Sequence, residues 1–349
     1  MRKRMISMGL ALLLCLSLSL PAFAASTGYS DVPEGHWSAQ SVLRATELGL
    51  FQGVGGGKFG LGQPITRAAF VTALVRLFGW ESVTPEHSTY TDVTPERWFY
   101  SAVETAYANG AIPSTGSTFR PTENITREEM AVMLVRGLGY TSLAGAVSSY
   151  SSPFTDVFTN KGFITVAYDL GIVDGVGDGK FAPDSTATRE QAAAVLVRVY
   201  DRLHAASALM SSTAGYTRIT VDTPEADASQ ELPTTPLEPL ADLYDALRTL
   251  KNSGGDMTKA VLCLTAGGVR TVVSGKQIVS TDTLTAAEVA EILAKEGTRT
   301  YYSTRYESAY CIYQPNAYQT ATVWYQSQES QAAKLRLARL FGVTRYIVE

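Results

Sequence analysis

The chain has 349 residues, of which 45% are hydrophobic and 18% charged, and its formal net charge is −4 at pH 7. This acidic balance excludes nucleic acid as a natural partner, because proteins that bind it present a basic surface. The three histidines lack metal-ligand spacing, so we predict no metal site, and no motif predicts a cofactor. Three cysteines are too few for a disulfide scaffold; a single bridge between Cys263 and Cys311 and two free thiols fit equally well.

Residues 1–24 have the layout of a secretory signal peptide. Three basic residues at 2–4 precede an apolar run over 6–20 and a small-x-small cleavage site, Ala-Phe-Ala, at 22–24. The run is shorter than the ~20 residues of a membrane-spanning helix, so we expect a secreted protein without a membrane span, with an uncleaved anchor as the alternative. Cleavage leaves 26 Lys and Arg against 33 Asp and Glu, a net charge of −7.

Three segments of the following chain repeat one another. YSDVPEGHW, YTDVTPERW and FTDVFTNKG are each followed by an amphipathic stretch, and later by KFGLGQPITRAAF, TFRPTENITREEM and KFAPDSTATREQA. In every repeat the Phe precedes a Thr-Arg pair by seven residues, and that Arg precedes a second Arg by nine. Such regular spacing indicates three copies of one structural unit.

Each repeat is predicted to be a helix, a loop and a second helix. The second helix begins after a threonine that suits an N-cap, at Thr66, Thr126 and Thr188. Three positions later stand Ala69, Glu129 and Gln191, so repeats two and three complete a capping box and repeat one does not. One helix pair has too little core to fold alone, so we expect the three to pack into a compact, mainly α-helical domain.

These segments resemble S-layer homology domains, which combine an aromatic-x-Asp-Val opening, a Trp, a Gly-rich turn before Phe, and Thr-Arg-Ala-Glu at a helix start. On this basis the repeats span 29–80, 90–140 and 154–203. The resemblance implies a pseudo-threefold domain that binds secondary cell-wall polysaccharide, often pyruvate-bearing, in grooves between repeats. It also implies a secreted protein located at the bacterial cell wall and surface.

The arginines of the Thr-Arg pairs are the main binding candidates: Arg67, Arg127 and Arg189. The helix macrodipole disfavours a cation in the first turn, so the repeated placement suggests a compensating anion. The carboxylate of a ketal-linked pyruvate would suit the guanidinium fork and the free N–H groups of a helix start. The alternative is an ion pair inside the protein, with the aspartates of the Asp-Val motifs: Asp31, Asp92 or Asp156. We expect these aspartates to cap turns more than to contact ligand, although they remain candidates.

Two tryptophans and two glycines complete the candidate site. Trp37 and Trp98 offer flat faces to sugar rings, or else lie wedged between helices. Gly55 and Gly177 permit loops that a ligand approaches closely. The repeats are unequal: the first has Ala in place of the family's Glu, the second has a short turn at 113–117, and the third lacks the Trp, whose place Phe158 or Phe163 fills. We therefore expect one or two competent grooves.

The composition then shifts to Ser, Thr, Ala and Pro over 204–240, which predicts a linker. From 241 to 349 helical and strand patterns alternate, predicting a small α/β domain. We expect helices at 241–252, 285–295 and 327–341, and strands at 260–264, 269–279 (a hairpin), 300–306, 309–314, 319–325 and 343–348.

The segment AYCIYQ…TATVWYQSQESQAAKLRLARLFGVTRYIVE resembles, weakly, the end of a glycoside hydrolase family 18 barrel, the chitinase-like enzymes. The family's chemistry needs an Asp-x-x-Asp-x-Asp-x-Glu strand. The nearest match begins at Asp242 and Asp245 but continues to Leu247 and Thr249, so it lacks the last Asp and the Glu. A complete barrel also takes ~200 residues. We therefore predict an incomplete, partly barrel-like domain without catalytic residues. The alternatives are a wall-anchored glycoside hydrolase and an S-layer subunit.

Overall fold

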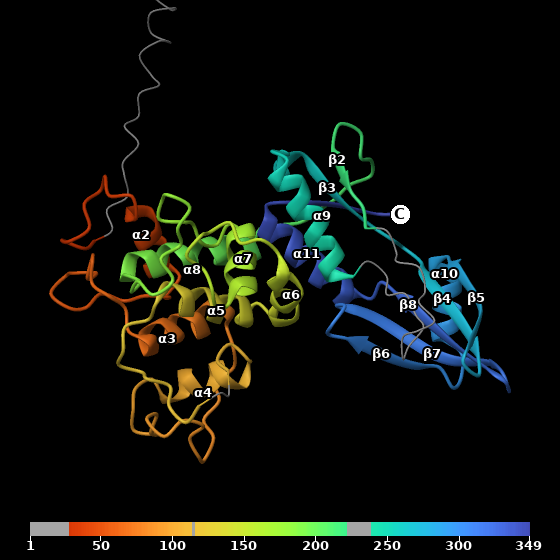
Figure 1. Cartoon of the computed structure of the whole chain (residues 1–349), viewed down its shortest axis with the longest axis horizontal. Coiled ribbons are helices and arrows are strands. Elements are labelled where there is room, and N and C mark those ends of the chain that lie inside the picture. Colours follow the sequence, from red (N-terminus) through yellow and green to blue (C-terminus); the bar gives the residue numbers. More distant parts are fainter. Residues whose placement is uncertain (1–27, 114–115, 222–238) are drawn as a thin grey trace, which may run out of the picture.

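The computed structural model describes residues 28–113, 116–221 and 239–349 (Figure 1). The predicted signal peptide at 1–24 lies outside these residues. Helices make up the first half of the described chain and two β-sheets the second. None of the helices in the three described stretches combines the length and the apolar character that crossing a bilayer requires.

Each repeat folds into two helices joined by a loop, as predicted. The pairs are α2 (Ala39–Glu47) with α3 (Arg67–Phe78), α4 (Tyr100–Ala108) with α5 (Arg127–Gly137), and α7 (Lys161–Asp169) with α8 (Arg189–Leu203). A glycine with positive φ follows the first helix of every pair, at Gly49, Gly110 and Gly171. A short helix that the repeats do not predict, α6 (Thr141–Ala146), and the 3-10 turn η1 (Val147–Ser149) lie between repeats two and three.

Threonine N-caps begin the second helix of the repeats and fix where it starts. The Thr126 hydroxyl accepts from the Glu129 N–H at 3.1 Å, and the Glu129 carboxylate accepts from the Thr126 N–H at 3.0 Å. In repeat three the side-chain oxygen of Gln191 accepts from the Thr188 N–H at 3.1 Å. In repeat one Thr66 accepts from the N–H of Ala69, whose methyl group cannot return a bond.

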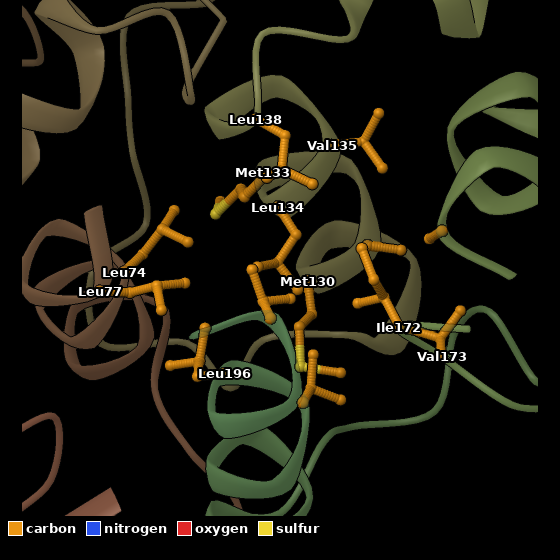
Figure 2. Packing of buried hydrophobic residues seen from close by; sticks show 14 of the residues in the cluster. Leu74, Leu77, Met130, Met133, Leu134, Val135, Leu138, Ile172, Val173 and Leu196 are labelled. Atoms are coloured by element: carbon orange, nitrogen blue, oxygen red, sulfur yellow. The ribbon is translucent and has the colours of Figure 1, made fainter. Parts of the chain in front are cut away.

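The backbone just before each cap joins the three repeats into a ring. Ile125 donates to the carbonyl of Ile65 at 2.9 Å, and Ala187 donates to the carbonyl of Ile125 at 2.9 Å. Ile65 closes the cycle by donating to Ala187 at 3.0 Å, as repeats related by a pseudo-threefold axis require. Side chains of α3, α5 and α8 converge on one buried core (Figure 2), which includes Leu74, Leu77, Met130, Leu134 and Leu196.

A four-stranded parallel sheet begins the second half. In spatial order its strands are β1 (Ala208–Leu209), β9 (Arg345–Val348), β3 (Ala260–Leu264) and β2 (Thr217–Ile219). All five residues of β3 are buried, as expected for an interior strand of a parallel sheet. Two helices lie beside this sheet (Figure 1): α9 (Leu240–Asn252) and α11 (Gln328–Phe341).

The other sheet is antiparallel and has five strands. In spatial order they are β5 (Gln277–Leu284), β4 (Gly268–Ser274), β8 (Gln319–Tyr325), β7 (Ser308–Asn316) and β6 (Arg299–Ser303). Helix α10 (Ala286–Leu293) packs on one face through Val289 and Ile292. The predicted α/β elements are thus present, but they divide between two sheets, and the described strands do not close a barrel.

The prediction of a linker over 204–240 is wrong for part of that stretch. Strands β1 and β2 lie within it and pair in parallel with β9 and β3. Both are very short edge strands whose residues, apart from Ile219, are exposed. They therefore lack the alternation of apolar and polar residues by which a strand is recognised in a sequence. The remainder of the predicted linker, 222–238, lies outside the described residues.

The two halves of the described chain share one hydrophobic core instead of being joined only by a tether. Helix α11 packs on α8, and α9 packs on α6. Asp169, buried at the end of α7, accepts from the Tyr244 hydroxyl at 2.5 Å and from Arg248 Nε at 2.7 Å, both on α9. Lys251 Nζ donates to the main-chain oxygen of Asp169 at 2.6 Å. These contacts fix the C-terminal half to repeat three.

Candidate functional site

The arginines of the three Thr-Arg pairs all make the same contact, each with the repeat that follows in the ring. Nε of Arg67 donates to the carbonyl of Phe119 at 2.8 Å, and the guanidinium lies 4.8 Å from the centre of the Phe119 phenyl ring. Arg127 and Arg189 make the same bond with the equivalent phenylalanines of repeats three and one, at 2.9 Å each. Burial lowers the pKa of all three arginines from their ordinary value. Each arginine therefore joins two neighbouring repeats.

The aspartates of the Asp-Val motifs bind backbone. Asp31 accepts the N–H groups of residues 59–61 at 2.7–3.0 Å. Asp92 and Asp156 each accept two N–H groups of their own repeat at 2.7–2.8 Å. Burial raises the pKa of Asp31, but its backbone donors together outweigh this effect and hold the pKa below the ordinary 3.8. The aspartates thus shape the loop before the second helix.

One of the three arginines has a carboxylate partner within the described residues. Glu129 Oε1 lies 2.6 Å from Arg67 Nη1 and 2.5 Å from Arg120 Nη2. Burial raises the pKa of Glu129, but the Thr126 N–H and the two guanidinium groups outweigh it and keep the pKa below the ordinary 4.5. Glu129 is therefore a carboxylate anion at neutral pH, and it neutralises part of the positive charge around Arg67.

The other two arginines complete their hydrogen bonding with main-chain oxygens. Nη2 of Arg189 donates to the carbonyl of Gln52 at 2.8 Å, and Nη2 of Arg127 donates to the carbonyl of Asp174 at 2.7 Å. The alternative of an ion pair with an Asp-Val aspartate is not realised for any of the three in the part of the chain described. A carbonyl carries no net negative charge, so the positive charges of Arg127 and Arg189 are not neutralised by these bonds.

A groove of 250 Å³, which we call groove 1, lies beside α3 of repeat one. Its positive charge comes from Arg189 of repeat three and Arg76 of repeat one, and its aromatic wall includes Trp98 of repeat two. No carboxylate is among the residues that line it: Leu50, Phe51, Gln52, Ala69, Thr72, Arg76, Trp98 and Arg189. All three repeats therefore contribute to a positively charged, partly aromatic groove.

The corresponding groove beside α5 of repeat two, which we call groove 2, has a volume of 560 Å³. Its lining contains three arginines and two glutamates: Arg67, Arg120, Arg136, Glu128 and Glu129. Phe163 of repeat three lines it where Trp98 lines groove 1, so this half-buried Phe takes the place of the missing Trp. Groove 2 is therefore larger than groove 1 and carries its own anions.

The remaining candidates differ in where they lie. Trp37 and Trp98 are 63% and 69% exposed, which excludes a position wedged between helices. Trp98 lines groove 1, whereas Trp37 lines neither groove. Gly55 and Gly177 adopt φ of 101° and 107° at the tips of two loops, and neither lines groove 1 or groove 2. Of this group, Trp98 alone lines groove 1 or groove 2.

The second arginine of each repeat also has a structural role, and its only signal in the sequence is the nine-residue spacing from the first. Arg76, Arg136 and Arg198 donate to carbonyls that follow the first helix of their own repeat, at 3.3, 3.1 and 2.8 Å. A cation near free carbonyls at a helix end is favourable. Arg76 and Arg136 also line grooves 1 and 2, so each of these grooves contains guanidinium groups from two repeats.

A family model described as the S-layer homology domain matches residues 28–71, 89–131 and 153–193. An endoglucanase from Bacillus sp. strain KSM-635 is 30% identical over 56% of this chain and 22% of its own length. A cell surface protein of Thermoanaerobacter kivui is 29% identical over 50% of this chain and 22% of its own. The S-layer protein sap of Bacillus anthracis is 25% identical over 61% and 26%. The matched part is thus about a quarter of each of these relatives.

Solved structures with some likeness include a spore cortex-lytic enzyme and a chitinase. The spore cortex-lytic enzyme SleL from Bacillus cereus has a TM-score of 0.32 and 14% identity, covering 39% of this chain and 30% of that one. A chitinase from Chromobacterium violaceum has a TM-score of 0.31 and 19% identity, covering 39% and 40%. These TM-scores are too low to support a conclusion about fold or activity.

Proposed function

We propose that this protein, which carries three S-layer homology domains and is a secreted cell-surface protein, holds itself to the bacterial cell wall by binding a secondary cell-wall polysaccharide non-covalently. Groove 1 is the observation that carries the proposal. Two guanidinium groups and an exposed indole border a groove whose lining contains no carboxylate. An acidic chain overall thus presents a local cationic site, which suits an anionic glycan.

The chemistry of groove 1 fits a sugar that carries a carboxylate. A guanidinium fork can donate two parallel hydrogen bonds to the two oxygens of a carboxylate, as a ketal-linked pyruvate would present them. Trp98 offers a flat apolar face to a sugar ring and an indole N–H to its hydroxyl groups. Gln52 and Thr72 add polar side chains to the lining. Together these groups would hold both the ring and its acidic substituent.

We propose that the C-terminal half has no catalytic activity of its own. The rival function, a wall-anchored glycoside hydrolase, needs two positioned carboxylates. Burial and the charge of Asp245 raise the pKa of Asp242, but both lie on α9, and Asp245 accepts from the Tyr150 hydroxyl at 2.7 Å where the halves meet. Glu288 accepts the N–H of its own N-cap. Release of chromophore from a chromogenic chito-oligosaccharide by the full chain would support the rival; we expect none.

Replacing Trp98 by alanine should weaken retention of the full chain on native wall sacculi. Losing the contact between the indole and a sugar ring should cost about 1–1.5 kcal/mol of binding free energy, which corresponds to roughly a tenfold weaker affinity. Because the side chain is 69% exposed, the free energy of unfolding should change by less than about 0.5 kcal/mol. The matched control is Phe158→Ala, which removes an aromatic ring that is 80% exposed and lines neither groove. Equal retention of both variants in a sedimentation assay would contradict a role for groove 1.

A further inference from the structure

The residue three positions after each N-cap threonine differs among the repeats, and in grooves 1 and 2 it lies beside the arginine of the preceding repeat. The series is Ala69, Glu129 and Gln191, so the side-chain charge is zero, negative and zero. We infer that groove 1 is the site that takes the carboxylate of the wall polysaccharide, and that Glu129 closes groove 2 to it by occupying Arg67 from within. This inference rests on the proposed function and adds to it a residue that sets the specificity of each groove.

In groove 2 the place of a ligand carboxylate is already filled. One oxygen of Glu129 accepts the N–H of Thr126, and the other lies 2.6 Å from Arg67 and 2.5 Å from Arg120. The Arg67 side chain is only 8% exposed and the Glu129 side chain 23%. An incoming carboxylate would have to displace an intramolecular ion pair that loses no translational freedom on forming. Groove 2 is therefore shielded against the anionic substituent, although its volume would admit a sugar.

In groove 1 the same position is open because the side chain of Ala69 ends at Cβ. Arg189 uses Nε and Nη2 on the carbonyls of Phe59 and Gln52 and makes no ion pair with any of the described residues. Gly60 stands where Arg120 stands in repeat two, so groove 1 lacks the second guanidinium that pairs with Glu129, although a Cβ at Gly60 would lie 2.9 Å from Gln63 Oε1 and 3.1 Å from the Arg189 side chain. Groove 1 therefore leaves room beside Arg189 for the carboxylate oxygen that Glu129 provides in groove 2.

The third repeat has a neutral amide at this position, Gln191. The side-chain oxygen of Gln191 accepts from the Thr188 N–H at 3.1 Å, and the amide carries no charge. However, the Asp174 carboxylate lies 3.2 Å from Arg198, the equivalent of Arg76 in groove 1. Repeat three thus already pairs its second arginine internally. Among the three repeats, groove 1 alone has both of its arginines without a described carboxylate partner.

The test compares two substitutions of Ala69, the capping-box position of repeat one. Ala69→Glu would complete it and place a carboxylate beside Arg189, whereas Ala69→Gln would complete it without charge, as Gln191 does. Neither change removes a native contact, so weaker binding would not reflect unfolding. The probe is a hexosamine carrying a cyclic pyruvate ketal, titrated into the full chain by calorimetry beside the same sugar as its uncharged methyl ester. Glu129→Gln tests groove 2, because it removes the internal anion and keeps the cap.

We expect Ala69→Glu to weaken binding of the ketal at least about tenfold and Ala69→Gln at most about threefold. The methyl ester should bind the wild type weakly and respond equally to both variants. Glu129→Gln should raise the number of ketal molecules bound per chain. Equal weakening by Ala69→Glu and Ala69→Gln would overturn the inference, as would an unchanged number of sites in Glu129→Gln. Retention of the chain on native sacculi without binding of the ketal would also overturn it while leaving wall anchoring intact; failure of both would remove the proposed function itself.

Discussion

Asp169→Ala should lower the free energy of unfolding of the full chain by about 3 kcal/mol, the largest stability loss that we expect from a single polar substitution. The carboxylate is buried and accepts from the Tyr244 hydroxyl and from Arg248 across the contact between the halves. Burial and the Asp169 charge raise the pKa of Tyr244, so its hydroxyl stays protonated and donates. Removing the acceptor leaves a buried hydroxyl and a half-buried cation unpaired. Urea unfolding followed by tryptophan fluorescence measures the loss.

Asp201→Ala is the matched control, because Asp201 forms an exposed pair with Arg44 at 3.4 Å. Exposed pairs contribute little, so this variant should lose less than about 1 kcal/mol. Because the two halves share one core, both variants should unfold in one transition. Two separate transitions in the wild type, with Asp169→Ala affecting neither midpoint, would show that the contact between the halves contributes nothing to stability.

Arg189→Lys should weaken binding to native sacculi by at least about tenfold. A lysine keeps the charge but cannot hold a carboxylate with a planar fork while also donating to the two carbonyls that Arg189 binds. Hydrogen bonds to charged groups contribute about 1.5–3 kcal/mol, which sets the expected size of the loss. Sedimentation of the full chain at several sacculus concentrations measures the affinity.

Arg127→Lys is the comparison that separates binding from stability. Arg127 makes the same bonds, to Phe181 at 2.9 Å and Asp174 at 2.7 Å, so both variants should lose similar stability. Since repeat three pairs its second arginine with Asp174, Arg127→Lys should weaken retention far less than Arg189→Lys. Equal loss of retention in the two variants would mean that these arginines act only by joining the repeats.

Local signals in the sequence predicted most of the elements. The repeat pattern located all six repeat helices, because threonine caps and glycine ends are properties of a few adjacent residues. Strand β3 matched its predicted limits, 260–264, since a buried parallel strand is a continuous apolar run. Helix α6 and the two short edge strands were missed because they carry no such local pattern.

The candidate site was less accessible to sequence reasoning because its contacts are with backbone atoms and with other repeats. The sequence identifies Arg67, Arg127 and Arg189 as candidates. It does not indicate their partners, because these are main-chain carbonyls, which every residue has. From the sequence, Ala69 in place of the family's Glu predicts a weaker first repeat. The arrangement around Arg189 favours the opposite interpretation, since the missing carboxylate leaves that guanidinium open to a ligand.

The shared core also restricts the motion of the C-terminal half relative to the repeats. A flexible linker would let that half move independently of the wall-binding repeats. Instead, α9 and α11 pack on repeat three, and Asp169 joins the two halves through a buried network. We therefore expect the C-terminal half to be held in a fixed orientation relative to grooves 1 and 2.

The most direct test of wall anchoring is sedimentation of the purified full chain with native wall sacculi and with sacculi chemically stripped of their secondary polysaccharide. The proposed function predicts that the chain pellets with native sacculi, stays in the supernatant with stripped ones, and is released from native ones by the soluble polysaccharide. Equal pelleting with native and stripped sacculi would contradict it, because the binding partner would then be the peptidoglycan itself.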